Sequence, residues 1–291
     1  MIELLYHTST SEFYKDKSIN NAYLSGAEEL PLIRFRCFDD FDWMDAVMTT
    51  RIGGISSGYL STLNLGSDHG DSPQNVEKNY RILADNLGFE YNRIIKSNQV
   101  HSPDFVYIDD KNCSFDGPLH SAFPDRDGFY TYERGIPLCV GAADCVPVFL
   151  VAPDIEYVAV VHSGWKGTTY GISGLCAREL INRGGSPDKI VALIGPSICQ
   201  DNYEVTGDLY EAFDKAGFRA EILDVIFEKT DDVHYNLDLW AACYYTLIDA
   251  GVSANNIHFS NVCTYDNHEL LFSHRYEKGL RGTLNGIIWK L

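Results

Sequence analysis

The chain has 291 residues, and 23 Lys and Arg against 41 Asp and Glu give it a formal net charge of −18. Hydrophobic residues make up 45% and charged residues 22%, which excludes a mainly disordered or collagen-like protein. Because so acidic a chain repels phosphate backbones and anionic lipids, we expect it to bind neither nucleic acid nor membranes. A small anion would have to bind in a local pocket of cationic side chains and backbone N–H groups.

The N-terminus and the cysteines bear on where the protein works. The first residues have no basic region followed by an apolar run, so we expect no signal peptide. Eight cysteines are spread over the chain without a C-x-x-C pair, which predicts reduced thiols in a cytoplasmic protein. They are Cys37, Cys113, Cys139, Cys145, Cys176, Cys199, Cys243 and Cys263.

The clearest predicted helix begins at Ser72-Pro73, where a capping side chain precedes a proline at the first helical position. Its apolar residues Val76, Tyr80 and Leu83 recur at helical spacing, and Gly88 follows as a C-terminal stop. Three further helices are expected over residues 172–181, 209–216 and 237–250, each followed closely by glycine.

Short apolar runs rich in β-branched residues predict strands between and after these helices. They cover residues 157–161, 190–194, 257–262 and 286–289, and residues 137–151 indicate two strands, or one bent strand, interrupted near 142–144. Strands and helices are mixed along a chain with no linker or repeat, so we expect a single domain of the α/β or α+β class. The chain has neither a G-x-G-x-x-G nor a Walker loop, which disfavours dinucleotide and nucleoside triphosphate folds.

Three segments place His101, Cys145 and His162 at or near the ends of apolar strands, beside small or turn-forming residues. Such ends are places where side chains from separate strands converge, and His with Cys suits a transition metal, most often Zn²⁺. Structural zinc sites usually take their ligands in close pairs, and none exists here. Three separate ligands instead resemble a catalytic site that leaves one position for water or substrate.

Two other interpretations of these residues stay open. The histidines could be core residues with satisfied hydrogen bonds and Cys145 a buried thiol. Alternatively, Cys145 and His162 could form a thiolate–imidazole pair for nucleophilic catalysis, with Asp144 or Gln99 as accessory groups. The alternatives differ in their use of His101, because a three-ligand metal site needs it and a Cys–His nucleophile does not.

Polar residues in other turns could supply an anion site. Arg51 and Asn64 lie in glycine-containing turns, Lys166 follows the His162 segment, and Arg275 lies near the end of the chain. Each could simply stabilise a turn or face solvent. In an acidic chain, however, cations that shared a pocket with the metal could hold a phosphate or a carboxylate.

Taken together, strings along the chain resemble one known family, the laccase-domain family, which is also described as polyphenol oxidase, purine nucleoside phosphorylase and peptidoglycan editing factor. The strings that carry the resemblance are Thr50-Arg51-x-Gly53-Gly54, Leu63-Asn64-Leu65-Gly66, Gly70-Asp71, Gln99-Val100-His101, Asp127-Gly128, Ala143-Asp144-Cys145-Val146-Pro147-Val148, Val161-His162-Ser163-Gly164-Trp165-Lys166-Gly167, Ile194-Gly195-Pro196-Ser197-Ile198, Tyr203-Glu204-Val205 and Phe272-Ser273-x-Arg275. They keep the family's order from about residue 48 onward. We therefore expect residues 1–47 to form a peripheral N-terminal segment and residues 48–291 the metal-binding catalytic domain.

The resemblance implies a single domain of mixed β-sheets packed together and flanked by helices. It also implies a metal site, usually zinc, at His101, Cys145 and His162. The cytotoxic necrotizing factor toxins have a related catalytic fold that uses a Cys–His pair, which keeps a hydrolase function in view. The chain departs from the family where two adjacent basic residues often follow Phe-Ser-Tyr, because here Ser273-His274-Arg275 is followed by Arg281 only further on.

The family's activities differ in what they require of the chain. Copper polyphenol oxidase chemistry needs several closely paired histidines, whereas the chain has nine His and no His-x-His, so copper is disfavoured. The resemblance implies phosphorolysis of adenosine, inosine or methylthioadenosine, and adenosine deamination, with nucleoside and phosphate as ligands. A zinc-activated water suits deamination.

Phosphorolysis needs a held phosphate and a proton donor. We expect Arg51, Lys166 or Arg275, with Asn64 nearby, to bind the phosphate, and Asp144 or a His to move the proton. Catalytic roles thus fall on Cys145, Asp144 and His162. The alternative is an amidase that edits a cytoplasmic peptidoglycan precursor, and the sequence leaves the oligomeric state open.

Overall fold

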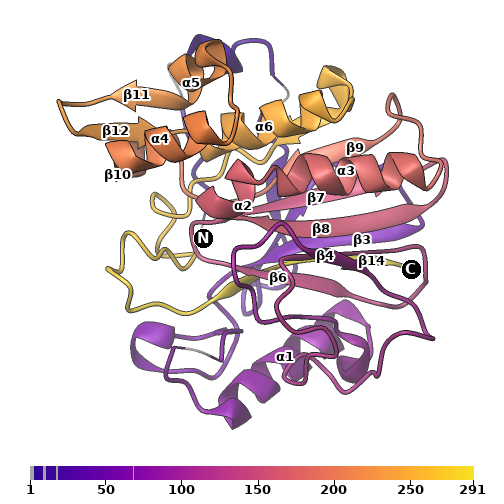
Figure 1. The fold of residues 1–291 in the computed structure, drawn as a ribbon. Helices are drawn as coiled ribbons and strands as arrows, with labels where there is room; N and C mark the ends of the chain where they lie inside the picture. Colours follow the sequence, from indigo (N-terminus) through magenta and orange to yellow (C-terminus); the bar gives the residue numbers. More distant parts are fainter. Residues whose placement is uncertain (1–2, 9–10, 18, 68) are drawn as a thin grey trace.

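Four layers of secondary structure, in the order helix, sheet, sheet and helices, make up the computed structural model (Figure 1). It describes residues 3–8, 11–17, 19–67 and 69–291. In this part of the chain the α-helices are α1 (Pro73–Leu87), α2 (Trp165–Thr169), α3 (Ile172–Asn182), α4 (Gly207–Lys215), α5 (Ala220–Ile226) and α6 (Leu239–Asp249). The strands are β1 (Ala22–Ser25), β2 (Leu32–Phe35), β3 (Met44–Thr49), β4 (Phe105–Tyr107), β5 (Gly128–Thr131), β6 (Leu138–Ala142), β7 (Val146–Ala152), β8 (Tyr157–Ser163), β9 (Val191–Ile194), β10 (Glu204–Thr206), β11 (Phe227–Lys229), β12 (His234–Leu237), β13 (Ile257–Phe259) and β14 (Leu284–Lys290).

A five-stranded antiparallel sheet, in the order β1-β2-β3-β14-β6, forms one inner layer. Successive residues of β14 point to opposite faces, as the pleat of a strand requires. Ile287 and Trp289 meet α1 on the outer face, whereas Leu284 and Ile288 face the second sheet. Both faces are therefore buried, which explains why β14 is apolar along most of its length instead of alternating with polar residues.

The second inner layer is a six-stranded mixed sheet in the order β13-β9-β7-β8-β5-β4. In β7, Val148 and Leu150 pack under α3 and α6, whereas Phe149 and Val151 contact the five-stranded sheet. The two sheets approach closely at Gly286, where an added Cβ would lie 2.9 Å from the Phe149 ring. A small third sheet, β10-β12-β11, lies with α4 and α5 beyond α6, at the top of Figure 1.

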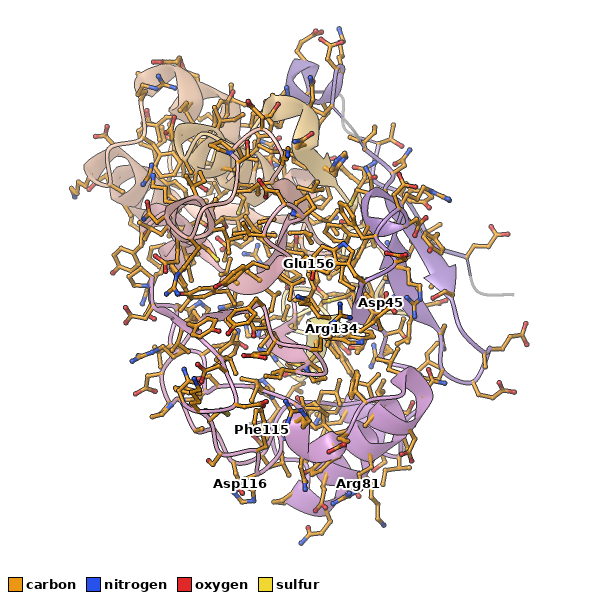
Figure 2. The ribbon with its side chains drawn as sticks, turned by 90° about the vertical axis from the view of Figure 1, so that its right-hand side faces the viewer. Asp45, Arg81, Phe115, Asp116, Arg134 and Glu156 are labelled. Atoms are coloured by element: carbon orange, nitrogen blue, oxygen red, sulfur yellow. The ribbon has the colours of Figure 1, made fainter. Side chains whose placement is uncertain are left out.

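An ion pair joins the last strand, β14, to the six-stranded sheet. Lys290 donates a hydrogen bond to Glu156, in the turn between β7 and β8, at 3.0 Å. Arg134 lies 4.0 Å from the same carboxylate, and Figure 2 shows Arg134 and Glu156 close together on one face. The ion pair of Lys290 with Glu156 helps to hold the two sheets together at the end of β14. No helix among the described residues is long and apolar enough to cross a membrane.

The fold expected from the sequence, a single domain of mixed sheets packed together and flanked by helices, is confirmed. Helix α1 begins after a Ser72 side chain that accepts a hydrogen bond from Asn75 N, and it ends at Gly88 with φ 75°. Residues 137–151 form the two strands β6 and β7, separated by a bend. All eight cysteines are free thiols in the structure.

Part of the N-terminal segment lies in the five-stranded sheet. Strands β1 and β2 extend the five-stranded sheet, Ile33 and Phe35 lie in the core between the sheets, and the boundary expected after residue 47 falls inside β3. Strands as short as β1 and β2 have too few residues to show a periodic pattern, which is why the sequence does not predict them. Residues 1, 2, 9, 10 and 18 of this segment lie outside the described part of the chain.

Candidate metal centre

Three side chains from distant parts of the sequence meet where the two large sheets end. His101 lies in the loop before β4, Cys145 in the bend between β6 and β7, and His162 near the end of β8. One ligand atom from each lies within 4.8 Å of the other two. The imidazole rings of His101 and His162 have their centroids 4.8 Å apart, in an edge-to-face arrangement.

Cys145 is presented by a backbone turn that its neighbour holds in place. Asp144 has φ 91°, a conformation that residues other than glycine adopt rarely. Its carboxylate accepts hydrogen bonds from the Thr264 hydroxyl at 2.6 Å and from the Arg275 backbone N–H at 2.7 Å. The Asp144 carboxylate thus fixes the bend against the loop that follows β13, and it does not line the pocket described below.

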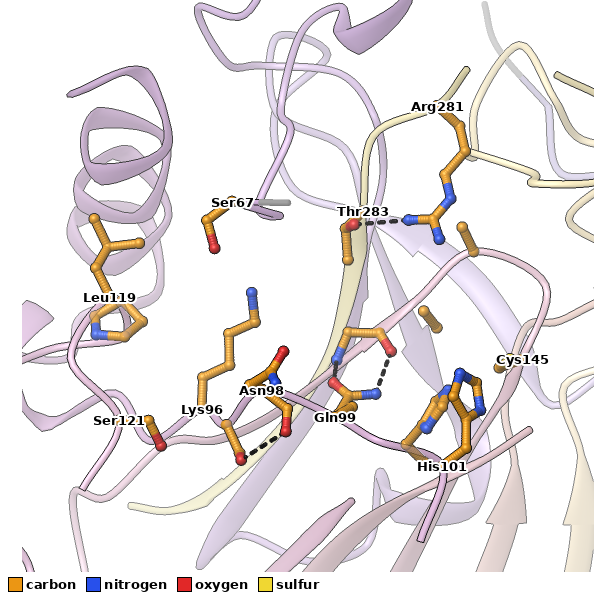
Figure 3. A pocket seen from close by; sticks show the side chains of 16 residues that line it. Ser67, Lys96, Asn98, Gln99, His101, Leu119, Ser121, Cys145, Arg281 and Thr283 are labelled. Carbon is orange, nitrogen blue, oxygen red and sulfur yellow. Dashed lines mark hydrogen bonds between the residues drawn. The ribbon is translucent and has the colours of Figure 1, made fainter. Parts of the chain in front are cut away.

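The His101 loop is held against β6, the outer strand of its sheet, by the Gln99 side chain, whose amide forms the two hydrogen bonds that a backbone amide would form. The Gln99 amide donates a hydrogen bond to Gly141 O at 2.9 Å and accepts one from Gly141 N at 2.6 Å. Both contacts are drawn as dashed lines in Figure 3. His101 itself has φ 59°, so the backbone turns sharply at this residue. Its side chain is thereby directed towards Cys145 and His162 (Figure 3).

Asp127 links the loop of His101 to His162. The fully buried carboxylate accepts hydrogen bonds from three successive backbone N–H groups, those of Val100, His101 and Ser102, at 2.8–3.1 Å. It also lies 2.9 Å from Nδ1 of His162. A carboxylate on one imidazole nitrogen fixes the tautomer and leaves the other nitrogen available to a metal, which is the arrangement around most metal-bound histidines.

The pKa values of these groups follow from burial and from one another. Burial lowers the pKa of His101 to about 4, with a further contribution from His162. Burial also opposes the charge of His162, but the interactions with Cys145 and the hydrogen bond to Asp127 outweigh it and raise the pKa of His162 to about 9. Burial would raise the pKa of Asp127, yet hydrogen bonds from His162 and Ser102 lower it below its usual value. His101 is therefore neutral at pH 7 and able to bind a metal, whereas His162 would release its proton when a metal binds.

Gly164 permits the close approach of the three side chains. A Cβ built at this position would lie 2.7 Å from His101 Nδ1 and 3.0 Å from Cys145 Sγ. The backbone of Gly164 has φ −70° and ψ 171°, which any residue can adopt. The need for glycine here is therefore steric and arises from the site itself.

A polar cavity of about 270 Å³ opens beside the three side chains (Figure 3). Its walls come from the His101 loop, from β6, from the segment just before β14 and from residues 118–121. Two cations line it. Lys96 donates to Leu65 O at 2.7 Å, and Arg281 donates to the Thr283 hydroxyl at 2.9 Å. A cavity with a possible metal site at one end and two cations along its walls suits a small anionic or polar ligand.

The structure does not bring the four residues expected to bind substrate into this cavity. Arg51 forms an ion pair with Glu277 at 3.1 Å and donates to His268 O, which joins two loops. Arg275 donates to Glu204 O and lines a different cleft with Trp165 and Tyr203.

The other two of these residues, Asn64 and Lys166, do not line the cavity either. Asn64 is fully buried, and its side chain accepts hydrogen bonds from Gly66 N and Thr283 N, so it shapes the wall of the cavity from behind. Lys166 is exposed on α2, with its ammonium group 5.4 Å from the Trp165 ring.

The sequence motifs do not predict a role for Asp127, Lys96 or Arg281. Asp127 belongs to an Asp-Gly string, and Arg281 is a basic residue further along the chain than the family usually has it. Lys96, five residues before His101, lies within the same loop, and that proximity was the one available signal. Which cation faces the cavity depends on long-range contacts that spacing in the sequence does not reveal.

A family model described as multi-copper polyphenol oxidoreductase laccase matches residues 45–291. The chain belongs to this family. It is 35% identical over 251 residues to the purine nucleoside phosphorylase YlmD of Geobacillus stearothermophilus, with 84% of this chain and 89% of that protein covered. It is also 35% identical over 233 residues to the adenosine deaminase RL5 of an unknown prokaryotic organism, with 80% and 88% covered.

Solved structures agree with the family assignment. The hypothetical protein YfiH of Bacillus licheniformis superposes with a TM-score of 0.85 at 28% identity, covering 91% of this chain and 98% of that one. The structure of YlmD from Geobacillus stearothermophilus gives a TM-score of 0.83 at 30% identity, covering 92% and 99%. These likenesses extend over nine-tenths of the chain.

We predict that Gly164→Ala weakens Zn²⁺ binding by about tenfold or more, because the added methyl group displaces His101 from the other two side chains. Equilibrium dialysis against Zn²⁺ with a competing chelator measures this. Gly207→Ala is the matched control, since its added methyl would meet nothing nearer than Tyr235 at 3.7 Å. Equal Zn²⁺ affinity in both variants and the parent would show that Gly164 does not govern the site.

Proposed function

We propose that this chain is a zinc-dependent purine nucleoside enzyme that cleaves adenosine, inosine or methylthioadenosine with phosphate and deaminates adenosine. The observation that carries the proposal is the convergence of His101, Cys145 and His162 at one end of a polar cavity lined by Lys96 and Arg281. The names of the relatives support the substrate class, since they include purine nucleoside phosphorylases and an adenosine deaminase.

The donor set fits zinc. Zn²⁺ binds Cys sulfur at about 2.3 Å and His nitrogen at about 2.0–2.1 Å, so two ligand atoms of a tetrahedral site lie about 3.3–3.6 Å apart. The three ligand atoms of the site lie within 4.8 Å of one another, and an inward shift of the side chains by about 1 Å would complete the geometry. His101, Cys145 and His162 would hold the ion, and Asp127 would orient His162 from behind. A zinc ion with an open fourth position lowers the pKa of a coordinated water to about 7, which supplies a nucleophile at neutral pH.

The chain's own residues would bind and orient the substrate. Lys96 and Arg281 would hold the phosphate, since they are the cations among the described residues of the cavity wall. A local positive field of this kind is needed because the chain as a whole repels anions. The polar side chains of Ser67, Asn98 and Ser121, which also line the cavity, offer hydrogen bonds to a ribose or a purine.

Asp144 receives a positioning role in this proposal. Both of its carboxylate oxygens accept hydrogen bonds from the loop after β13, so they support the Cys145 bend and do not face the cavity. The position of His101 argues against a simple Cys–His hydrolase. That chemistry does not need a second imidazole, yet His101 is directed at Cys145 by its own loop and by Gln99.

The decisive test offers adenosine to the zinc-loaded protein with and without phosphate. We expect adenine and ribose 1-phosphate only when phosphate is present, and inosine in either case, because deamination needs water and not phosphate. Cys145→Ser should lose bound zinc and both activities together. Cys176→Ser is the matched control, because Cys176 is buried in α3 away from the cavity. Absence of both products, with release of an amino acid from a peptidoglycan precursor instead, would replace the proposal with the amidase.

The anion site is tested separately. Arg281→Gln should raise the KM for phosphate by about tenfold or more, since a hydrogen bond to a charged group contributes about 1.5–3 kcal/mol. Zinc content should not change. Arg275→Gln is the control, because its guanidinium lines the other cleft. A higher KM in Arg275→Gln and not in Arg281→Gln would move the phosphate site to that cleft.

A further inference from the structure

A second group of potential metal ligands lies outside the cavity. His7, in the N-terminal segment, meets Cys199, just before the short 3-10 helix Gln200–Asn202, and Asp266, in the loop after β13. One ligand atom from each lies within 4.8 Å of the other two. This group shares no residue with the site of Cys145, and the proposed function does not use it.

The spacing within the group is close to that of ligands around a shared ion. Oδ2 of Asp266 lies 4.0 Å from Nδ1 of His7 and 4.0 Å from Sγ of Cys199. The second contact is within reach of a weak hydrogen bond from the thiol, whereas the first is longer than the about 2.7–3.2 Å of a direct N–H···O hydrogen bond. Two ligand atoms on one tetrahedral zinc ion lie about 3.3–3.7 Å apart. A small inward shift of these side chains would therefore bring them to the spacing of ligands that share one ion.

The chemistry of the surroundings favours a soft divalent cation. Cys199 is fully buried, and a second buried thiol, Cys263, accepts a hydrogen bond from Cys199 N at 3.3 Å. The Asn202 amide donates to Asp266 at 2.8 Å and to Cys199 at 3.2 Å, so it orients both ligands. Oδ2 of Asp201 lies 3.8 Å from Nε2 of His7, on the opposite side of the ring from Asp266. A carboxylate in that place is the usual outer partner of a metal-bound imidazole.

We propose that His7, Cys199 and Asp266 form a second transition-metal site, specific for Zn²⁺ or a similar divalent ion, with Cys263 next to the fourth position. Thiolate, imidazole and carboxylate are the three kinds of ligand that zinc takes in proteins. The site is structural, since its ligands are drawn from a terminal segment and two loops and it lies outside the cavity.

A metal at the second site would fix the N-terminal segment to the loop after β13, which holds the bend of Cys145 in place. Tyr6 forms a β-bridge with Val262, and His7 N donates to Asn261 O, so the segment already runs beside the loop that contains Cys263. The next residue, Thr264, donates to the Asp144 carboxylate beside Cys145. A metal bound at His7 would therefore stiffen the loop that fixes the catalytic bend.

Cobalt binding tests the proposal on the full-length protein. After removal of metals and reduction, we expect the parent to bind two Co²⁺ per chain and Cys145→Ser to bind one, which still gives a cobalt–thiolate charge-transfer band. Adding His7→Gln to Cys145→Ser should weaken this remaining site by about tenfold or more. In the parent background, His7→Gln alone should lower the content from two to one, which avoids reliance on the Cys145 variant.

His234→Gln is the matched control, because His234 also lies beside a carboxylate, that of Asp231, at 2.8 Å but belongs to neither group of possible metal ligands among the described residues. It should bind as much Co²⁺ as the parent. The proposal is wrong if Cys145→Ser shows no thiolate band, if His7→Gln binds as tightly as the parent, or if mass spectrometry finds Cys199 and Cys263 joined in a disulfide that excludes metal. None of these outcomes depends on nucleoside activity, so the second site fails or stands independently of the proposed function.

Discussion

The arrangement of the candidate metal centre depends on the buried carboxylate of Asp127. Its oxygens accept hydrogen bonds from three successive backbone N–H groups at residues 100–102 and contact Nδ1 of His162. One side chain thus fixes the backbone of His101 and the ring orientation of His162. An ionised carboxylate without these partners would be costly to bury, so the loop, the imidazole and the carboxylate stabilise one another.

The packing of the sheets brings Asp127 to this position. Gly128, the first residue of β5, has no room for a side chain, since an added Cβ would lie 2.5 Å from Val161 on β8. The close pairing of β5 with β8 lets His162 N donate to Asp127 O at 2.6 Å. The Asp127-Gly128 string is therefore one structural unit. Glycine permits the approach of the strands, and aspartate uses that approach to bind His162.

Much of this architecture could be predicted from local chemistry, and the remainder depends on contacts between distant residues. Helix α1 carries its own cap and stop, and β7 and β8 are apolar because both of their faces are buried, so short stretches of sequence define them. Strands β1, β4 and β10 have three or four residues, which is too few for a periodic signal. The three possible ligands could be named from residue type and motif, whereas the cations could not. Arg51 and Arg275 stand in specific strings yet face other loops, because sequence does not show which side of a turn a long side chain takes.

The role of Asp127 is tested most directly by comparing the Zn²⁺ affinity of Asp127→Asn with that of Asp104→Asn, after thermal unfolding has shown that each variant is folded. Both substitutions remove one negative charge from the same region, but Asp104 is exposed whereas Asp127 contacts His162. If Asp127 organises the centre, Asp127→Asn binds Zn²⁺ about 10–100-fold more weakly than the parent, while Asp104→Asn binds it with unchanged affinity. A folded Asp127→Asn protein with the parent's Zn²⁺ affinity would show that Asp127 does not organise the centre.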